Sequence, residues 1–243
     1  MTELSVNLNK IALLRNSRGH DAPNVVEFAE KFIALGVKGI TIHPRQDERH
    51  ITRQDAYDLG DLIRPLVGIE LNIEGYPSED FLQLIEAIRP DQTTLVPDLP
   101  GQLTSDHGFD FHTQGEFLAP ILGRLKNTGT RVAVFLDPDI GQVKLAAQSE
   151  ADRIELYTEA YAASFNRPNR HQIHQQYQEA AALAVALGLG VNAGHDLNLE
   201  NLPRFVSIAG IQEVSIGHAL VIECLELGMA MVIRRYLAIC QKG

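Results

Sequence analysis

The chain has 243 residues, of which 45% are hydrophobic and 21% are charged, and its formal net charge is −10. This length suits one large domain or two small ones, and so acidic a chain lacks the basic face that a nucleic-acid-binding protein needs. No apolar run approaches the roughly 20 residues of a membrane span, and the first ten residues lack the layout of a signal peptide. We therefore expect a cytoplasmic protein.

One pattern repeats along the chain: a short run rich in β-branched residues ends in a polar residue, and an amphipathic stretch follows. The runs predict strands at Leu4–Asn9, Gly39–His43, Ile69–Glu74, Gln92–Pro97, Arg131–Asp137, Arg153–Tyr157, Gly190–Ala193 and Glu213–Ile216. The amphipathic stretches predict helices over 24–35, 53–65, 79–89, 114–127, 140–148, 170–187, 199–208 and 219–238.

Several of these helices have start signals in the sequence. Thr113 and Glu116 have the spacing of a capping box, and Ser78 and Thr52 are weaker N-cap candidates. The last helix contains both cysteines of the chain, Cys224 and Cys240, which by themselves cannot form a disulfide framework or a four-ligand zinc site.

Strands that alternate with helices require crossover connections and so a parallel sheet. The mean repeat, 243/8 or about 30 residues, is close to that of a (β/α)₈ barrel of ~250 residues. We therefore predict an α/β fold of the TIM-barrel type. A doubly wound sheet is the alternative, although no GxGxxG motif follows the first strand. No linker or change of composition divides the chain, so we expect one domain over residues 1–243.

Three of the predicted loops that follow strands are long, at residues 10–23, 98–112 and 158–169. Such loops build the active face of a barrel, so polar residues at the strand ends should share one cavity. The cations expected there would suit a phosphate or a carboxylate, and they are Lys10, Arg15, Arg18, Arg45 and His50. The alternative is that Arg15 and Arg49 merely pair with nearby acidic residues.

Glycine precedes histidine at the ends of the last two predicted strands, in Gly194-His195 and Gly217-His218. Barrels often bind phosphate at this position through loop amides and a helix N-terminus, and glycine lets the backbone approach the anion. The alternative is that these glycines only relieve crowding at the strand ends.

Glu74 and His43 end neighbouring strands, and His195 ends a more distant one. A partly enclosed carboxylate and a histidine suit proton transfer in carbonyl chemistry. Three other interpretations stay open: a divalent metal site of a sugar-phosphate isomerase, made of His43, Glu74, His195 and His218; a Schiff-base aldolase that uses Lys10; and a non-catalytic barrel that binds a phosphorylated metabolite.

Seven segments in order resemble pyridoxine 5'-phosphate synthase, the PdxJ family of vitamin B6 biosynthesis. They are SVNLNKIALLRNSRG (5–19), GITIHPRQDERHI (39–51), LNIEG (71–75), TTLVPD (93–98), LTSDHGFD (103–110), VNAGHDL (191–197) and VSIGHAL (214–220). The resemblance implies a TIM barrel with extra helices, assembled as an octamer that is a tetramer of dimers. It implies condensation of 1-deoxy-D-xylulose 5-phosphate with 3-amino-2-oxopropyl phosphate, with no metal or redox cofactor.

Site roles follow from the same resemblance. His43 and Glu74 would be proton acceptors and His195 the proton donor. Residues that would hold the aminoketone phosphate are Asn7, Arg18, Gly217 and His218, and the backbone at Asp196 would help the phosphate site. Those that would hold deoxyxylulose phosphate are Asn9, Lys10, Arg45, His50 and Thr104. The chain departs from the common family pattern at Asn9-Lys10, where the family has Asp-His. It also departs at Asp196, where the family has glycine, and at Ile222-Glu223, where the family has Gly-Arg. We expect a variant branch with the same reaction, in which substrate preference is open.

Overall fold

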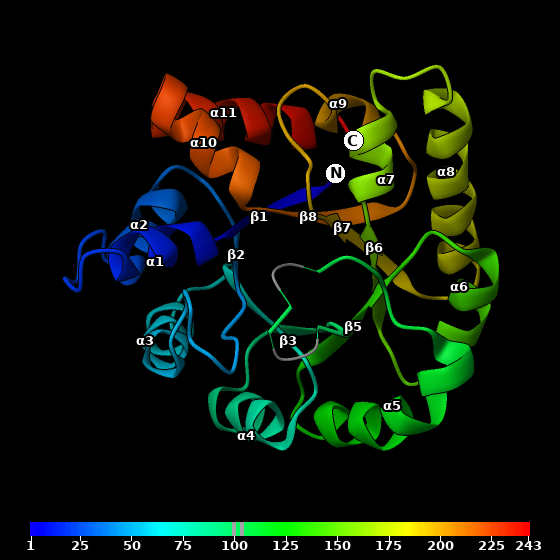
Figure 1. Cartoon of the computed structure of the whole chain (residues 1–243), viewed down its shortest axis with the longest axis horizontal. Coiled ribbons are helices and arrows are strands. Elements are labelled where there is room, and N and C mark those ends of the chain that lie inside the picture. The colour runs from blue at the N-terminus through cyan, green and yellow to red at the C-terminus, as the bar shows by residue number, and fades with distance from the viewer. Residues whose placement is uncertain (99–100, 103–104) are drawn as a thin grey trace.

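The computed structural model describes residues 1–98, 101–102 and 105–243, and within them eight parallel strands close into a barrel (Figure 1). The strands are β1 (Glu3–Asn7), β2 (Gly39–Ile42), β3 (Glu70–Gly75), β4 (Gln92–Leu95), β5 (Arg131–Leu136), β6 (Arg153–Tyr157), β7 (Gly190–Gly194) and β8 (Ile211–Ile216). Each pairs with the next, and β1 closes the ring by pairing with β8, where Val6 lies opposite Ile216. The predicted TIM-barrel fold is confirmed.

Helices surround the barrel on all sides in Figure 1. Those in the described part of the chain are α1 (Asn9–Asn16), α2 (Val25–Ala34), α3 (Arg53–Ile63), α4 (Glu79–Ile88), α5 (Phe111–Lys126), α6 (Ile140–Ala146), α7 (Glu159–Ser164), α8 (Arg170–Ala186), α9 (Leu202–Phe205), α10 (His218–Leu227) and α11 (Met229–Cys240). None of these helices is long and apolar enough to span a membrane.

The strands present two different faces, because successive side chains of a strand point to opposite sides. Aliphatic residues such as Ile40, Val134 and Ile154 are fully buried and belong to the hydrophobic core. The alternate positions are polar, and their side chains meet across the barrel. Thr94 on β4 donates to Glu155 on β6 at 3.3 Å, and Asn192 on β7 donates to Gln92 on β4 at 3.2 Å. Because these strands are not neighbours, the bonds lie inside the ring.

Two of the three predicted helix starts are confirmed. Thr52 and Asp55 form a complete capping box at the start of α3, and Ser78 accepts the backbone N–H of Phe81 at the start of α4. The prediction of a capping box at Thr113 is wrong. Helix α5 begins earlier, at Phe111, because the Asp110 side chain accepts the N–H of His112 and so caps the helix.

Two predicted loops and two predicted helices also need correction. Residues 10–23 and 158–169 contain the short helices α1 and α7 rather than only loop. The predicted helix over 199–208 is a single turn, α9. The predicted helix over 219–238 is two helices that meet at Gly228, where φ is +87°. Cys224 and Cys240 consequently lie in different helices, and both are free thiols.

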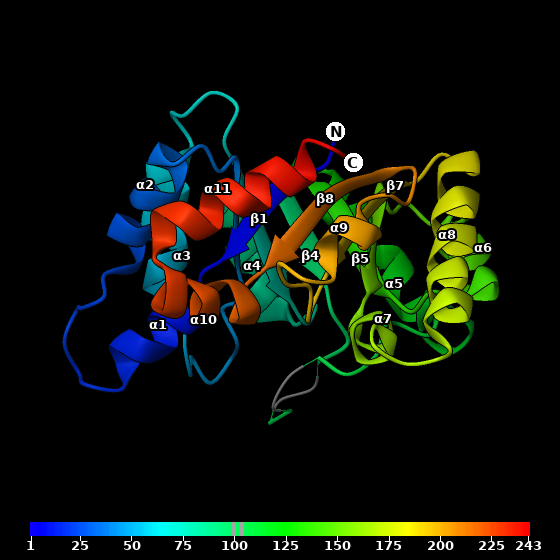
Figure 2. The same cartoon turned by 90° about the horizontal axis from the view of Figure 1, so that it is seen from above.

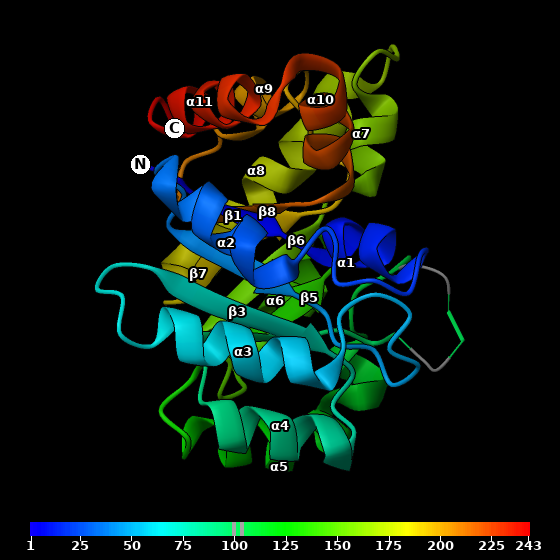
Figure 3. The same ribbon diagram turned by 90° about the vertical axis from the view of Figure 1, so that its left-hand side faces the viewer.

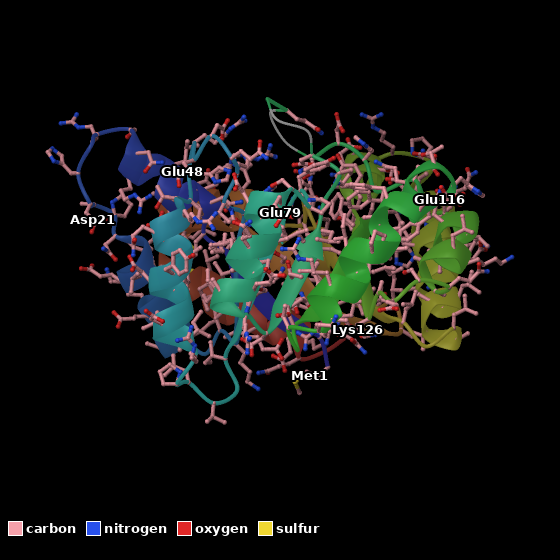
Figure 4. The ribbon with its side chains drawn as sticks, turned by 90° about the horizontal axis from the view of Figure 1, so that it is seen from below. Met1, Asp21, Glu48, Glu79, Glu116 and Lys126 are labelled. Atoms are coloured by element: carbon pink, nitrogen blue, oxygen red, sulfur yellow. The ribbon has the colours of Figure 1, made fainter. Side chains whose placement is uncertain are left out.

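One end of the barrel carries the segments that follow the strands. In Figures 2 and 3, α1 and α7 lie at the same end of the molecule. Figure 4 shows Glu48, Glu79 and Glu116 toward this edge, and Met1 and Lys126 toward the opposite edge. Near that opposite edge the two termini meet, where the N–H of Thr2 donates to the carbonyl of Cys240 at 3.2 Å. The candidate site therefore has to be sought at the first edge.

Candidate active site

A cavity of about 660 Å³ lies at the carboxyl ends of the strands. Most of the residues predicted for the site line it: Asn7, Asn9, Lys10, His43, Arg45, His50, Glu74, His195, Asp196, Gly217 and His218. Arg18 does not line it. That residue lies beyond α1 in an exposed turn. Thr104 lies outside the described residues. Side chains that the sequence analysis assigned to five strand ends thus line the same cavity.

The end of β1 ties together the next two strands. The Oδ1 atom of Asn7 accepts the N–H of Asn9 at 2.9 Å, and its Nδ2 donates to Glu74 at 3.4 Å. The Asn9 side chain accepts the backbone N–H of His43 at 2.9 Å. Asn9 therefore fixes the backbone that carries His43 while it also lines the cavity.

Two histidines face each other on the β2 side of the cavity. The rings of His43 and His50 are 6.3 Å apart, and both residues are buried. Burial, and then the positive charge of Arg45, lower the pKa of His43 well below its ordinary value. The same causes lower the pKa of His50 to about 4. Both rings are therefore neutral at physiological pH and can accept a proton.

The pKa values of the carboxyl groups in the cavity are raised, whereas those of the two histidines are lowered. Burial, and then the charge of Glu155, raise the pKa of Glu74 well above its ordinary value. Burial and the charge of Glu213 raise the pKa of Glu155 to about 8. A carboxyl group that takes up and releases a proton near neutral pH suits general acid–base catalysis.

Glu155 is a residue of the site that our sequence analysis did not single out. It lies in the middle of β6, is 3% exposed and lines the cavity with Glu74. Gly194 allows this approach, because a Cβ at that position would come within 2.8 Å of the Glu155 carboxylate. The sequence feature that could have indicated Glu155 is a carboxylate between the two aliphatic residues Ile154 and Leu156 in RIELY. Because these two neighbours point away from the inside of the barrel, the Glu155 side chain points into it.

The predicted group of cations is only partly correct. Lys10, Arg45 and His50 line the cavity, as does Arg49. Arg15 does not, because it forms a buried ion pair with Asp55 at 2.5 Å in the packing between α1 and α3. Arg45 pairs with Asp98 and donates to the Gln102 carbonyl at 2.9 Å. Arg49 pairs with Asp47 at 2.6 Å. Lys10 has no ion pair among the residues that the structure describes.

The ends of β7 and β8 form the other wall. His195 packs its ring edge-on against Tyr157, with 5.1 Å between ring centroids. Gly217 precedes α10, whose first residue is the exposed His218. The first N–H groups of a helix and the positive end of its dipole favour an anion. This wall can therefore hold a phosphate, and it lies beside the wall that carries Lys10, because β8 pairs with β1.

A second cavity, of about 560 Å³, lies beside the first and shares His43, Arg45 and Arg49 with it. Its far wall comes from α4 and from Tyr76. No three histidine, cysteine or carboxylate side chains in the described part of the chain are grouped so that they could hold a metal ion.

Comparison with known proteins shows which family has a similar sequence. The model of the family described as pyridoxal phosphate biosynthesis protein PdxJ matches residues 4–242. The chain is 50% identical over 237 residues to a pyridoxine 5'-phosphate synthase of Bacteroides thetaiotaomicron, which covers 97% of this chain and 98% of that protein. It is also 50% identical over 238 residues to the protein of that name from Cytophaga hutchinsonii, with 98% of each covered.

Solved structures with much lower identity share the fold. Phosphoribosyl anthranilate isomerase from Thermotoga maritima is 12% identical and superposes with a TM-score of 0.64 over 100% of both chains. The tryptophan synthase α-subunit of Pyrococcus furiosus is 13% identical, with a TM-score of 0.65 over 98% of this chain and 97% of that one. At such identities the likeness extends to the barrel alone.

Proposed function

Because the chain belongs to the PdxJ family and is thus an enzyme of vitamin B6 biosynthesis, we propose that its cavity condenses 1-deoxy-D-xylulose 5-phosphate with 3-amino-2-oxopropyl phosphate. Pyridoxine 5'-phosphate synthase is the name carried by relatives at about 50% identity. The observation that carries the proposal is the single cavity that brings together His43, Glu74 and His195 from three strand ends. The products are pyridoxine 5'-phosphate, inorganic phosphate and water.

The two walls of the cavity suit two phosphate esters. Lys10, Arg45 and His50 would hold the deoxyxylulose phosphate, with Lys10 as a direct cationic partner where the common family pattern has histidine. Gly217 and His218, at the N-terminus of α10, would hold the aminoketone phosphate. A local group of cations in a chain of net charge −10 supports this assignment.

The reaction needs repeated proton transfers, because an imine forms with loss of water and a ring then closes. Two groups are suited to accept protons: neutral His43, whose pKa is lowered by burial, and Glu74, whose pKa is raised by burial. His195, on the opposite wall, would donate a proton to departing oxygen. Each of these groups lines the cavity in which both substrates would lie.

Assembly and location complete the proposal. We expect the chain to form the octamer, a tetramer of dimers, that the family resemblance implies, and to act in the cytoplasm. Both statements remain predictions. Exposed apolar side chains on α1, α10 and α11, such as Leu14, Leu225 and Met231, support self-association.

A direct assay tests the function. Purified protein, treated with a chelator to remove divalent metals, would be mixed with both phosphate esters, and pyridoxine 5'-phosphate would be followed by mass spectrometry. We expect turnover, and we expect Glu74→Gln to reduce kcat by at least about 100-fold while phosphate-ester binding survives. The control is Glu79→Gln, which changes an exposed carboxylate on α4 outside the cavity.

The outcomes separate the alternatives. Full activity of Glu74→Gln would remove its assigned role. Activity that depends on added divalent metal would favour the sugar-phosphate isomerase interpretation. Saturable binding of one ester without product would support a barrel that only binds a phosphorylated metabolite.

A further inference from the structure

The loop that follows β7 holds two consecutive residues in the left-handed region. The φ angles are +82° at His195 and +57° at Asp196. Such a conformation is unfavourable for residues other than glycine, and it persists only when the surroundings fix it. Here the Thr158 hydroxyl bonds the carbonyls of Gly194 and His195, and Asn201 donates to the carbonyl of Asp196 at 3.1 Å. The backbone of this loop is therefore held independently of the Asp196 side chain.

The Asp196 carboxylate contacts its neighbour rather than the next helix. Its Oδ2 atom is 2.9 Å from Nδ1 of His195. The backbone N–H groups of Glu200 and Asn201 donate instead to the side-chain oxygen of Asn198. The hydrogen bond from His195 lowers the pKa of Asp196 below its ordinary value, so Asp196 is a carboxylate at neutral pH.

We propose that Asp196 is a positioning residue for His195: its carboxylate accepts the Nδ1–H of the ring and so directs Nε2 to the substrate. The inference rests on the proposed function, in which His195 donates a proton. With Nδ1 engaged by Asp196, the proton that passes to a substrate is the one on Nε2. The arrangement has the same logic as other carboxylate–histidine pairs, in which the carboxylate sets the tautomer and orientation of the imidazole.

Other charged groups also surround the ring. Tyr157 on β6 contacts it edge-on, and Glu159 on α7, Asp106 and His218 line the same cavity. Asp137, at the end of β5, contributes to the negative field at Tyr157 together with Glu159, Asp106 and Asp196. Of these carboxylates, Asp196 is the one hydrogen-bonded to Nδ1 of His195.

Two substitutions at position 196 separate the role of charge from that of shape. Asparagine and glycine both accept a left-handed φ, so neither Asp196→Asn nor Asp196→Gly should disturb the fold. Asparagine keeps an oxygen that can accept from Nδ1 but carries no charge, whereas glycine removes both. Glu200→Gln, an exposed carboxylate in the same loop that lies outside the cavity, serves as the control.

The experiment combines kinetics with nitrogen-15 spectra of the histidine rings of the full-length protein, in which His195 is assigned by its loss in His195→Gln. We expect wild-type His195 to carry the Nδ1–H tautomer when neutral, and Asp196→Gly to shift it toward Nε2–H. We expect kcat to fall about threefold in Asp196→Asn and about tenfold in Asp196→Gly, with KM changed less than twofold.

Several outcomes would overturn the inference. Unchanged tautomer and kcat in Asp196→Gly would show that the carboxylate does not position His195. A lower KM for a phosphate ester with unchanged kcat would show that the carboxylate instead repels substrate. If the wild-type enzyme gives no product, the proposed function fails, and the ring spectra alone then decide whether Asp196 fixes the tautomer of His195.

Discussion

Glu155 and Glu213 place two carboxyl groups inside the barrel, and each is less than a tenth exposed. Burial is the largest cause that raises the pKa of Glu155, to about 8, and that of Glu213, to about 7. Hydrogen bonds from Thr94 and Gln92 offset only part of the cost of burying these groups. The interior therefore keeps protons that the unfolded chain would release near pH 4.5.

This proton retention makes stability depend on pH. Between about pH 4.5 and pH 8 the Glu155 side chain binds more protons in the folded protein than in the unfolded chain, so its contribution to the free energy of unfolding falls as the pH rises. We expect Glu155→Gln to match wild type at pH 5 and to be more stable than wild type at pH 8, by on the order of 2 kcal/mol. Urea unfolding at the two pH values measures the difference.

The exposed carboxylate of Glu226 provides the control, because Glu226→Gln should keep the wild-type dependence on pH. An equal slope in Glu155→Gln and wild type would mean that Glu155 is ionised in the folded protein. The enzymatic activity of Glu155→Gln should be measured on the same samples, since Glu155 lines the cavity with Glu74.

The sequence identified side chains at strand ends because strand polarity alone places them at one edge of a barrel. His43, Glu74 and His195 follow that rule, and all three line the cavity. Arg15 could not be assigned in this way, because its partner Asp55 is 40 residues away and comes close only when α1 packs against α3. Glu155 was not predicted because it does not lie at a strand end. Only the closed barrel shows that its side chain lines the same cavity as Glu74.

At the scale of elements, the strands could be predicted because β-branched runs bounded by polar residues mark them clearly. The helices α1 and α7 could not, since eight and six residues are too short to show an amphipathic period. The start of α5 was misplaced because Asp110 and Thr113 are both good caps, and the sequence does not reveal which one the preceding loop presents. Local signals thus compete, and tertiary contacts decide between them.

Gly228 divides what the apolar pattern predicts as one helix. It follows α10 and precedes α11, with φ +87° and ψ 134°, a combination that only glycine adopts without strain. A Cβ at this position would meet no heavy atom within 4 Å, so a substitution there changes backbone energy and not packing. We expect Gly228→Ala to lower the free energy of unfolding by about 2 kcal/mol and the thermal midpoint by about 4–8 °C.

Thermal unfolding followed by circular dichroism measures this effect. The matched control is Gly115→Ala, which also adds a methyl group in open space but lies within α5. There alanine should stabilise by about 0.5–1 kcal/mol. If both variants shifted the midpoint equally, the conformation of Gly228 would not be the cause.

At the scale of the whole molecule, several exposed large apolar side chains lie on three helices, α1, α10 and α11. Leu13 and Leu14 on α1, Leu225 on α10 and Met231 on α11 are between 42% and 77% exposed. Helix α1 contacts α10, and Figures 1 and 3 show α10 and α11 together on the same side of the barrel as α1. A group of apolar side chains on one side, in a chain whose net charge is −10, is typical of an interface between subunits.

This surface leads to a prediction about assembly. In solution the chain should have a mass several times that of its 26.8 kDa monomer, and eight times that mass if the family octamer forms. The double variant Leu225→Glu with Met231→Glu should reduce the mass measured by light scattering, because a charge buried in an apolar interface costs several kcal/mol per side chain. Val67→Glu is the control, since that exposed apolar side chain lies between α3 and β3, away from α10 and α11. A monomeric wild type would contradict the prediction, and a double variant with unchanged mass would place the interface on another face.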